Sequence, residues 1–343
     1  MNVCIATYQS VMMLKGGPKT QLLQTKAELE RLGVNATLFD SWNNFDKSKF
    51  DLVHLFGANV GTYHLAKELH KLGVPLVVSP IFFSLHSTRF LRTALAGDRL
   101  LRNLFKGFWI DYGFLRDICG WAQAVVPNTH HEAELLINGI GIESGKVTVV
   151  PNGVEDRFYY ADPSLFVKKY GKENFILNVG HIGPERKNIL TLIRLLADID
   201  REAVIIGRIE NTSSGRQCLE EAKNNPRILV LDSIPNDSPL LASAYAASDV
   251  FVLPSLFETP GIAALEAALA GSKIVITKHG GTTEYFGDYA DYVDPKSPAD
   301  IRRGIKNVLE RKKSHDLREH IRRTYLWSEV AKKTLSVYQQ VCA

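Results

Sequence analysis

Two glutamates, Glu258 and Glu266, have surroundings in this sequence that suit them to ligand chemistry. They lie in the stretch 253–271, LPSLFETPGIAALEAALAG, with seven residues between them. The run DVFVLPS before Glu258 is typical of a strand that is buried on both faces of a parallel sheet. The run IAALEAALA around Glu266 is apolar on almost every side, which indicates a buried helix. Glu266 is therefore predicted to be a buried carboxylate, and such a group needs a partner.

The turn between this strand and this helix is suited to binding an anion. Thr259 can act as the N-cap, and Pro260 can take the first helical position, where its missing N–H costs nothing. The amides of Gly261, Ile262 and Ala263 would then point out of the helix end without partners. Together with the helix dipole, these amides predict a phosphate site.

The spacing of the two carboxylates suggests a ligand. Eight residues of helical rise cover about 12 Å, roughly the span from a ribose across a diphosphate to a sugar. We therefore hypothesise that Glu258 and Glu266 hold opposite ends of a nucleotide-sugar. The alternative is structural, with Glu258 as a turn residue and Glu266 as a helix residue turned toward solvent.

Length and composition limit the class of protein. The 343 residues favour two domains, each large enough to bury a core. A hydrophobic content of 45% and a charged content of 23% are those of an ordinary globular protein. The net charge of +4 is small and spread along the chain, so charge does not suggest a nucleic-acid partner.

The cysteines and the N-terminus indicate the compartment, and the cysteines and histidines bear on metal binding. The four cysteines lie far apart without a C-x-x-C pair, which favours reduced thiols over a zinc site or disulfides. The histidines show no metal-ligand spacing, so no metal is predicted. MNVCIATY has no basic region of a signal peptide, and no apolar run reaches the length of a spanning helix. A cytoplasmic protein is expected.

Strand-like and helix-like runs alternate through most of the chain, which predicts parallel sheets flanked by helices. Six strand-like runs precede a turn-rich stretch at 151–173, which is the predicted interdomain linker, and five follow it. The stretch 300–341 is predicted to be helical and amphipathic. The strand-like runs are 2–8, 35–40, 51–57, 75–83, 122–128 and 146–150, then 174–180, 202–207, 227–233, 249–255 and 273–281. An α/β fold with two Rossmann-like domains follows from this alternation.

In open parallel sheets, ligands bind beyond the carboxyl ends of the strands. Two such domains facing each other would form a central cleft lined by the loops after the strands. Arg186 and Lys187 follow the run 174–180 and precede a helix. A basic pair at this place can neutralise a diphosphate leaving group, and solvated surface charge is the alternative.

Two glycine pairs stand in similar loops. Gly16 and Gly17 open the first predicted helix, where the backbone could approach an anion closely, although a plain turn fits equally well. Gly280 and Gly281 follow the strand after the Glu266 helix and could bring amides toward the sugar or the acceptor. Asp40 ends the second strand-like run about where a dinucleotide fold has its ribose-binding acid, but G-x-G-x-x-G is lacking.

The stretch 88–109 has a basic amphipathic pattern. At about 100° per residue, its cations and its apolar residues fall on opposite sides. Such a helix can lie on an anionic membrane, which would give a peripheral contact through 89–109 at the inner face. The favoured alternative is an ordinary helix that packs on the first domain, interrupted at Gly97 and Asp98. The cations are Arg89, Arg92, Arg99, Arg102 and Lys106, and the apolar residues are Phe90, Leu101, Leu104, Phe105 and Phe108.

Taken together, these motifs resemble family 4 of the glycosyltransferases, the retaining nucleotide-sugar enzymes with the GT-B fold. The resemblance covers essentially the whole chain. It implies an acceptor-side domain at 1–160, a nucleotide-sugar domain at 161–325, and a helix at 326–343 that packs back on the first domain. It is carried by the GG loop at Gly16, PNGV at Pro151, RKN at Arg186, the block LPS-x-x-E-T-P-G-x-x-x-L-E-A-x-x-A-G, HGG at His279 and the tail YLWSEVAKKTLSVY.

The resemblance also implies residue roles. Glu266 would bind the ribose hydroxyls, Lys187 the diphosphate and Glu258 the region of the donor sugar. His181 stands where the family usually has an Arg that helps to hold the diphosphate, and Arg186 could compensate. Transfer would retain the anomeric configuration and need neither a metal nor a cofactor. Catalysis would consist mainly of positioning and of stabilising the departing diphosphate, with Arg186, Lys187 and the amides after Pro260.

The expected function is transfer of a sugar from a nucleotide-diphosphate sugar to a hydroxyl of a glycan, a glycolipid or a small molecule. Envelope polysaccharide or glycoconjugate synthesis is the expected setting. One alternative is a weak or inactive sugar-binding or partner-binding subunit. Two departures motivate it: the chain has His181 where the family usually has an Arg, and it lacks the histidine that the family usually has in the first domain. Others are a nucleotide-sugar epimerase or hydrolase and, least favoured, a dinucleotide oxidoreductase.

Overall fold

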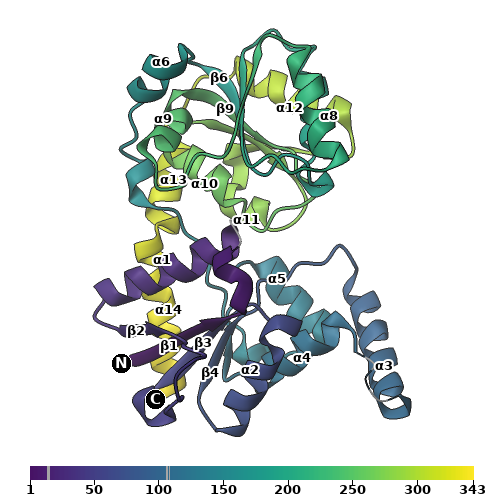
Figure 1. Cartoon of the computed structure of the whole chain (residues 1–343), viewed down its shortest axis with the longest axis vertical. Coiled ribbons are helices and arrows are strands. Elements are labelled where there is room, and N and C mark those ends of the chain that lie inside the picture. Colours follow the sequence, from purple (N-terminus) through teal and green to yellow (C-terminus); the bar gives the residue numbers. More distant parts are fainter. Residues whose placement is uncertain (14–15, 106, 108) are drawn as a thin grey trace. The chain divides into compact units, whose positions relative to one another are not determined.

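The computed structural model describes residues 1–13, 16–105, 107 and 109–343 and divides into two compact units. Unit 1 comprises Met1–Gly153 and Trp327–Ala343, and unit 2 comprises Val154–Leu326. Each unit has its own parallel sheet covered by helices (Figure 1). The predicted α/β fold with two Rossmann-like domains is confirmed. The predicted roles of the two domains stay predictions.

The sheet of unit 1 has the strand order β2-β1-β3-β4-β5, and all of its pairs are parallel. Alternate residues of one strand face opposite layers of the core, as Val3 and Ile5 do on one face and Cys4 and Ala6 on the other. The strands are β1 (Asn2–Thr7), β2 (Asn35–Leu38), β3 (Leu52–Phe56), β4 (Leu76–Ser79) and β5 (Ala124–Val125).

The predicted sixth strand at 146–150 is wrong. Its first residue belongs to a 3-10 turn, Ser144–Lys146, and Val147 makes only an isolated bridge to Val125. The neighbouring β5 has just two residues and is closely followed by Pro127, which has no N–H to donate. A longer ladder therefore does not form.

Helices cover both faces of this sheet. Side chains of α1 and α14 pack on one face, where α14 lies beside α1 (Figure 1). The Nδ1 atom of His54 on β3 lies 2.7 Å from the hydroxyl of Tyr338 on α14, and its Nε2 atom lies 2.9 Å from Oγ of Ser79. Burial lowers the pKa of His54 to about 3, so this histidine is a neutral link between helix and sheet. The helices are α1 (Gly17–Arg31), α2 (Val60–Lys71), α3 (Thr88–Leu104), α4 (Asp111–Trp121), α5 (His130–Glu134) and α14 (Trp327–Cys342).

The sheet of unit 2 has the order β11-β10-β9-β6-β7-β8 and is also parallel throughout. The sequence did not predict β11, because its four residues ADYV are short and include a charge. The strands are β6 (Phe175–Val179), β7 (Ala203–Ile206), β8 (Ile228–Leu231), β9 (Ser248–Leu253), β10 (Lys273–Thr277) and β11 (Ala290–Val293).

Two helical layers enclose the sheet of unit 2. Side chains of α6, α9, α10 and α13 pack on one face, and those of α7, α8 and α12 pack on the other. The helices are α6 (Ser164–Tyr170), α7 (Ile189–Leu196), α8 (Ser213–Lys223), α9 (Pro239–Ala247), α10 (Ile262–Leu269), α11 (Thr282–Phe286), α12 (Pro298–Glu310) and α13 (Asp316–Tyr325).

The predicted linker at 151–173 belongs almost wholly to unit 2. Phe158 and Phe166 are fully buried in the core of that unit. Phe158 and Phe166 are therefore core residues without a regular period, because they come from a short turn and a short helix, whereas Tyr160 is exposed.

Candidate functional site

Most of the predicted site residues of unit 2 stand in segments at the carboxyl ends of β6, β9 and β10, while Ile262, Ala263 and Glu266 lie in α10. Arg186 and Lys187 follow β6, Glu258 follows β9, and Gly280 and Gly281 follow β10. These three strands are neighbours in the sheet. The parallel topology therefore brings their loops together at one edge, as the sequence predicted.

Glu258 is the centre of a charge cluster at this edge. The Nζ atom of Lys187 lies 2.5 Å from Oε1 of Glu258, and a guanidinium nitrogen of Arg186 lies 3.5 Å from the same oxygen. Arg186 also donates a hydrogen bond to the carbonyl of Phe257. Burial by itself would raise the pKa of Glu258, but the charges of Lys187 and Arg186 outweigh it and lower the pKa. The cluster is thus an ionised carboxylate held between two cations.

Backbone hydrogen bonds hold the three loops against one another. The amide of Leu256 donates to the carbonyl of Arg186, at 2.8 Å. The amide of Glu258 donates to the carbonyl of His279, and the amide of Gly281 donates to the carbonyl of Glu258. Gly280 makes this approach feasible, because its φ is +103° and a Cβ there would lie 1.9 Å from the Glu258 carbonyl oxygen.

Gly280→Ala is therefore expected to lower the free energy of unfolding by about 2–5 kcal/mol and to displace Glu258. The matched control is Gly271→Ala, since Gly271 has a φ of +97° and a Cβ added there would meet no atom within 4 Å. The control substitution introduces only the backbone strain and should lower the free energy of unfolding by about 1 kcal/mol. Chemical denaturation of both variants measures the difference. Equal losses would show that the close approach of the two loops does not matter.

Glu266 lies in α10 and is 4% exposed, as the apolar pattern predicted for the helix. The hydroxyl of Tyr245 donates to Oε2 of Glu266 at 2.7 Å, and the side-chain amide of Asn236 donates to Oε1 at 2.8 Å. Burial raises the pKa of Glu266 to about 7 in spite of these two hydrogen bonds. Arg157 in turn donates to the carbonyl and the side-chain oxygen of Asn236. A carboxylate with this pKa can change its protonation state near neutrality.

The predicted start of α10 is wrong. The N-cap is Gly261, with a left-handed φ of +80°, and the first helical residue is Ile262. Thr259 and Pro260 lie in the bend before it, because the bridge from Glu258 to Gly280 holds the chain at the loop and the helix can begin only after the turn. Among the described residues, no backbone carbonyl and no capping side chain accepts a hydrogen bond from the amides of Gly261, Ile262 and Ala263. These amides are thus available to an anion, although Thr259 does not cap the helix.

The remaining predicted residues are placed as follows. His181 follows β6, and its Nδ1 atom lies 3.4 Å from Oε1 of Glu210. Gly16 and Gly17 belong to unit 1, where Gly16 is the N-cap of α1 and Gly17 is its first residue. The roles predicted for these three residues stay predictions.

Sequence reasoning missed the partners of Glu266. Asn236 stands in the loop SIPNDSP after β8, and the rule that loops after parallel strands line the site could have pointed to it. Tyr245 stands in the apolar helix α9, where nothing in the sequence indicates which residue its hydroxyl meets. Asn188 was also missed; it donates to the carbonyls of Pro254 and Pro295 and so ties the Arg186 loop to two others.

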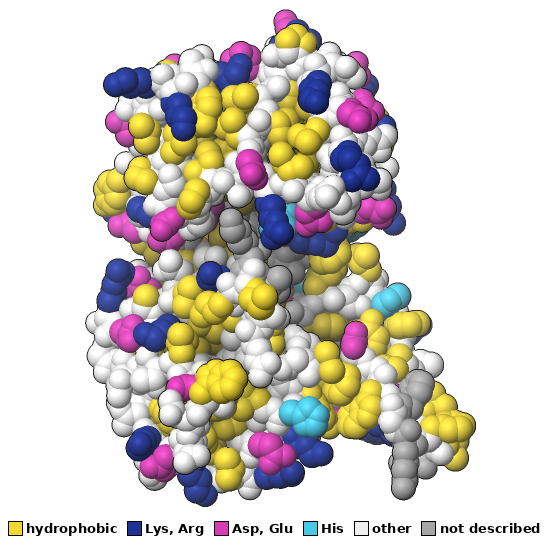
Figure 2. All heavy atoms as spheres, viewed as in Figure 1, with side chains coloured by type: hydrophobic (Ala, Val, Ile, Leu, Met, Phe, Trp, Pro, Cys, Tyr) yellow, Lys and Arg dark blue, Asp and Glu magenta, His cyan; other side chains and the backbone are white. Residues whose placement is uncertain are grey.

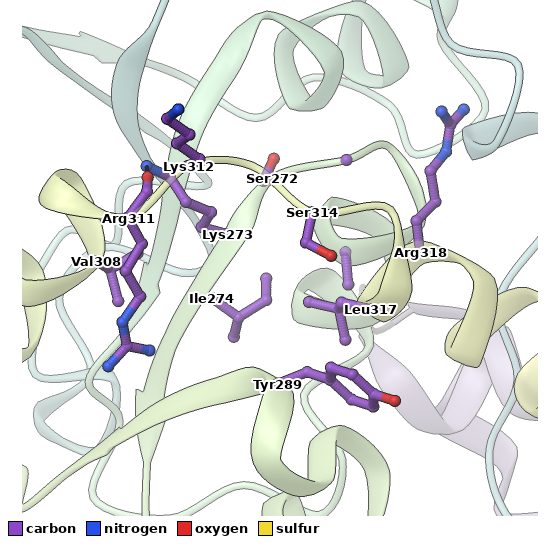
Figure 3. Close-up of a pocket in the computed structure, with 12 residues that line it drawn as sticks. Ser272, Lys273, Ile274, Tyr289, Val308, Arg311, Lys312, Ser314, Leu317 and Arg318 are labelled. Carbon is purple, nitrogen blue, oxygen red and sulfur yellow. Dashed lines mark hydrogen bonds between the residues drawn. The ribbon is translucent and has the colours of Figure 1, made fainter.

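A pocket of about 120 Å³ lies elsewhere in unit 2 (Figure 3). Ile274 and Leu317 stand at its centre, while Lys312 and Arg318 extend away from it. Its lining includes Lys273, the first residue of β10, so it lies at the amino ends of the strands. It is therefore distinct from the edge that holds Glu258.

Comparison with known proteins matches both units. A family model described as Glycosyltransferase Family 4 matches residues 21–158, and one described as Glycosyl transferases group 1 matches residues 166–324. The D-inositol 3-phosphate glycosyltransferase of Geodermatophilus obscurus is 31% identical over 236 residues, which are 63% of this chain and 52% of that protein. The chain thus spans about half the length of this curated relative, and the same holds for others that it matches.

Two solved structures share the fold along the whole chain. Sucrose-phosphate synthase from Thermosynechococcus elongatus superposes with a TM-score of 0.76 at 15% identity and covers 99% of this chain and 98% of its own. HepE from Anabaena, solved in complex with UDP and glucose, has a TM-score of 0.69 at 16% identity. The match covers 98% of this chain and 99% of the HepE chain. With both units matched by glycosyltransferase models and the fold shared over its full length, the chain belongs to the family 4 glycosyltransferases with the GT-B fold.

Proposed function

We propose that this chain is a retaining glycosyltransferase that moves a sugar from a nucleotide-diphosphate sugar to a hydroxyl group. The acceptor is a glycan, a glycolipid or a small molecule, and no metal or cofactor takes part. The observation that carries the proposal is the charge cluster of Lys187, Arg186 and Glu258 in the same unit as the buried carboxylate Glu266.

The cations and the free amides suit a diphosphate. Lys187 is 17% exposed and Arg186 is 42% exposed, so both remain accessible to a ligand. The amides of Gly261, Ile262 and Ala263 at the start of α10 add donors that need no reorganisation. These groups stabilise negative charge best as it builds up on the departing diphosphate.

The chemical step follows from this arrangement. The bond between the anomeric carbon and the phosphate oxygen breaks, and the electron pair leaves with the diphosphate. The acceptor oxygen bonds to the same face of the sugar, and its proton passes to the leaving phosphate oxygen. Glu258 positions the donor sugar and holds the two cations Lys187 and Arg186. Because the leaving phosphate takes the acceptor's proton, no separate base is required.

In this proposal, different carboxylates bind the ribose end and the sugar end of the donor. Glu266 accepts hydrogen bonds from the ribose hydroxyls, while Glu258 lies toward the sugar. A protein of the same fold, Anabaena HepE, binds UDP and glucose, which supports a nucleotide-sugar as the ligand here. The buried free thiols of Cys4, Cys119 and Cys218 support a reducing compartment such as the cytoplasm, with glycoconjugate or envelope polysaccharide synthesis as the setting.

A panel of UDP-, GDP- and ADP-sugars tests the proposal. We expect slow release of the nucleoside diphosphate from one donor without acceptor, unaffected by EDTA, and a product with the donor's anomeric configuration by proton NMR once an acceptor is supplied. The absence of both binding and turnover with every donor of the panel would contradict the proposal. Binding without turnover would indicate a sugar-binding subunit, and a new nucleotide-sugar epimer in the products would indicate an epimerase.

A further inference from the structure

In helix α3 of unit 1, the one acidic side chain is buried and three of the four arginines are exposed. Asp98 is the only acidic residue between Thr88 and Leu104, and it is 1% exposed. Its carboxylate lies 2.9 Å from Nε of Arg102, and Arg102 also pairs with Asp117 of α4 at 3.0 Å. The predicted interruption at Gly97 and Asp98 is wrong, because these inward ion pairs hold the helix in one piece against α4.

This anchoring turns Arg102 away from the cationic side on which the sequence placed it. Arg102 is 17% exposed, and its guanidinium stacks on the ring of Trp109 at 3.8 Å. Leu91 and Leu95 are buried beside Asp98 and pack in the core of unit 1. Apolar packing and ion pairs thus hold the inner side of α3 against the rest of unit 1.

The opposite side of α3 carries large apolar side chains in solvent. Phe90 is 49% exposed, Leu100 62% and Leu104 65%. Hydrophobic side chains lie on the surface at the lower right of Figure 2, in the region where Figure 1 draws α3. The predicted members Lys106 and Phe108 lie outside the described residues. An exposed apolar strip of this kind marks an interaction surface.

Three exposed arginines, Arg89, Arg92 and Arg99, lie next to this strip. At about 100° per residue, they occupy a sector of about 80°, and Phe90, Leu100 and Leu104 occupy the adjoining sector of about 80°. Arg92 donates to the carbonyl of Asn138, and no salt bridge among the described residues involves any of the three. Since Asp98 points inward, the ionised groups of α3 that face outward are all cations.

We propose that this outer face of α3 binds an anionic lipid surface. The apolar side chains enter the boundary between headgroups and acyl chains, and the arginines pair with the phosphates beside it. The charge decides between occupants: a second copy would bring three more arginines against these three, whereas an anionic bilayer neutralises them. None of the helices in the described ranges is long and apolar enough to cross a membrane.

Co-sedimentation of the full chain with vesicles tests this proposal. Vesicles of phosphatidylcholine alone are compared with vesicles that contain about 30% phosphatidylglycerol, at about 0.1 M and about 0.5 M NaCl. We expect binding to the anionic vesicles that weakens in high salt, and weak or no binding to the neutral ones. Absence of binding to the anionic vesicles at low salt would overturn the proposal.

Two variants separate the apolar and the ionic contributions. Leu100→Ser with Leu104→Ser should reduce the partition coefficient at least tenfold, and Arg89→Gln with Arg99→Gln about fivefold per arginine. Trp42→Ser, at a residue that is 95% exposed elsewhere in unit 1, and Lys223→Gln with Lys306→Gln in unit 2 are the matched controls. Equal losses in variants and controls would overturn the proposal. So would self-association that only the Leu100 and Leu104 substitutions abolish, without vesicle binding, because the face would then join two copies.

Discussion

Lys187→Ala is expected to lower kcat by about 10²- to 10³-fold. In the free protein its ammonium group lies 2.5 Å from Glu258. In the proposed reaction it stabilises charge that develops on the diphosphate, and loss of one such donor has an effect of this size. The substitution also removes the principal partner of a carboxylate that is 8% exposed, so stability should fall by about 1–3 kcal/mol as well. Steady-state kinetics with the donor identified by the panel measures the change.

Lys273→Ala is the matched control for this prediction. Lys273 is 13% exposed and pairs with Asp249 at 3.2 Å, but it lies at the amino end of β10, away from the loops of the site. We expect a similar loss of stability with kcat unchanged. Lys187→Arg should restore part of the turnover, since it keeps the charge. If Lys187→Ala and Lys273→Ala lost turnover in proportion to stability, Lys187 would be structural only.

Glu266→Gln is expected to weaken binding of the nucleoside diphosphate by about 10- to 100-fold. The carboxylate already accepts hydrogen bonds from Tyr245 and Asn236, and each of its oxygens has a further lone pair for a ribose hydroxyl. A hydrogen bond to a charged acceptor contributes about 1.5–3 kcal/mol, which the neutral amide loses in part. Isothermal titration calorimetry measures the affinity. Asp291→Asn, at a buried carboxylate paired with Arg311, is the control and should leave it unchanged.

The same variant should change how stability depends on pH. Burial raises the pKa of Glu266 to about 7, above its value of about 4.5 in an unfolded chain. Between these two values the folded protein holds a proton that the unfolded chain has released, so the free energy of unfolding falls as pH rises from about 4.5 to about 7. The fall attributable to Glu266 is about 3 kcal/mol, and above pH 7 it is complete. Denaturation at pH 5 and pH 7.5 should show this component in the wild type and its loss in Glu266→Gln.

A dependence of the wild type no larger than that of the variant would contradict the assignment. The groups that face Glu266 are Tyr245, Asn236, Arg157 and Glu155, and Arg157 lowers its pKa while Glu155 raises it. Nucleotide affinity gives a second readout. Because the ribose hydroxyls donate to the ionised form, affinity of the wild type relative to Glu266→Gln should rise with pH between about 6 and 8.

Local signals explain which parts of the site could be predicted. Glu258 and Glu266 stand in one strand, turn and helix, so the apolar pattern around them was sufficient to expect one at the carboxyl end of a strand and the other in a buried helix. Arg186, Lys187, Gly280 and Gly281 also stand in segments that come after strands. Since parallel strands all end at one edge of their sheet, order along the chain was enough to group these loops.

Long-range contacts explain the errors. The helix after Glu258 starts at Ile262 rather than after Thr259, because a bridge to Gly280 competes with the local capping signal. Arg102 turns inward because Asp98 and Asp117 hold it, although its place in the helical pattern suggested the opposite side. In both cases a partner distant in sequence or on another helix outweighed the local preference.

The sequence by itself determined the alternation of strands and helices, the two parallel-sheet domains and the positions of the two glutamates along the chain, because each depends on apolar periodicity and turn residues within a few positions. The tertiary structure alone decided which groups meet those glutamates: Lys187 at Glu258, and Tyr245 and Asn236 at Glu266. It also decided which side of α3 stays in solvent. The physical reason is that burial, ion pairing and pKa depend on distances between segments that lie tens of residues apart, and periodicity along the chain carries no information about those distances.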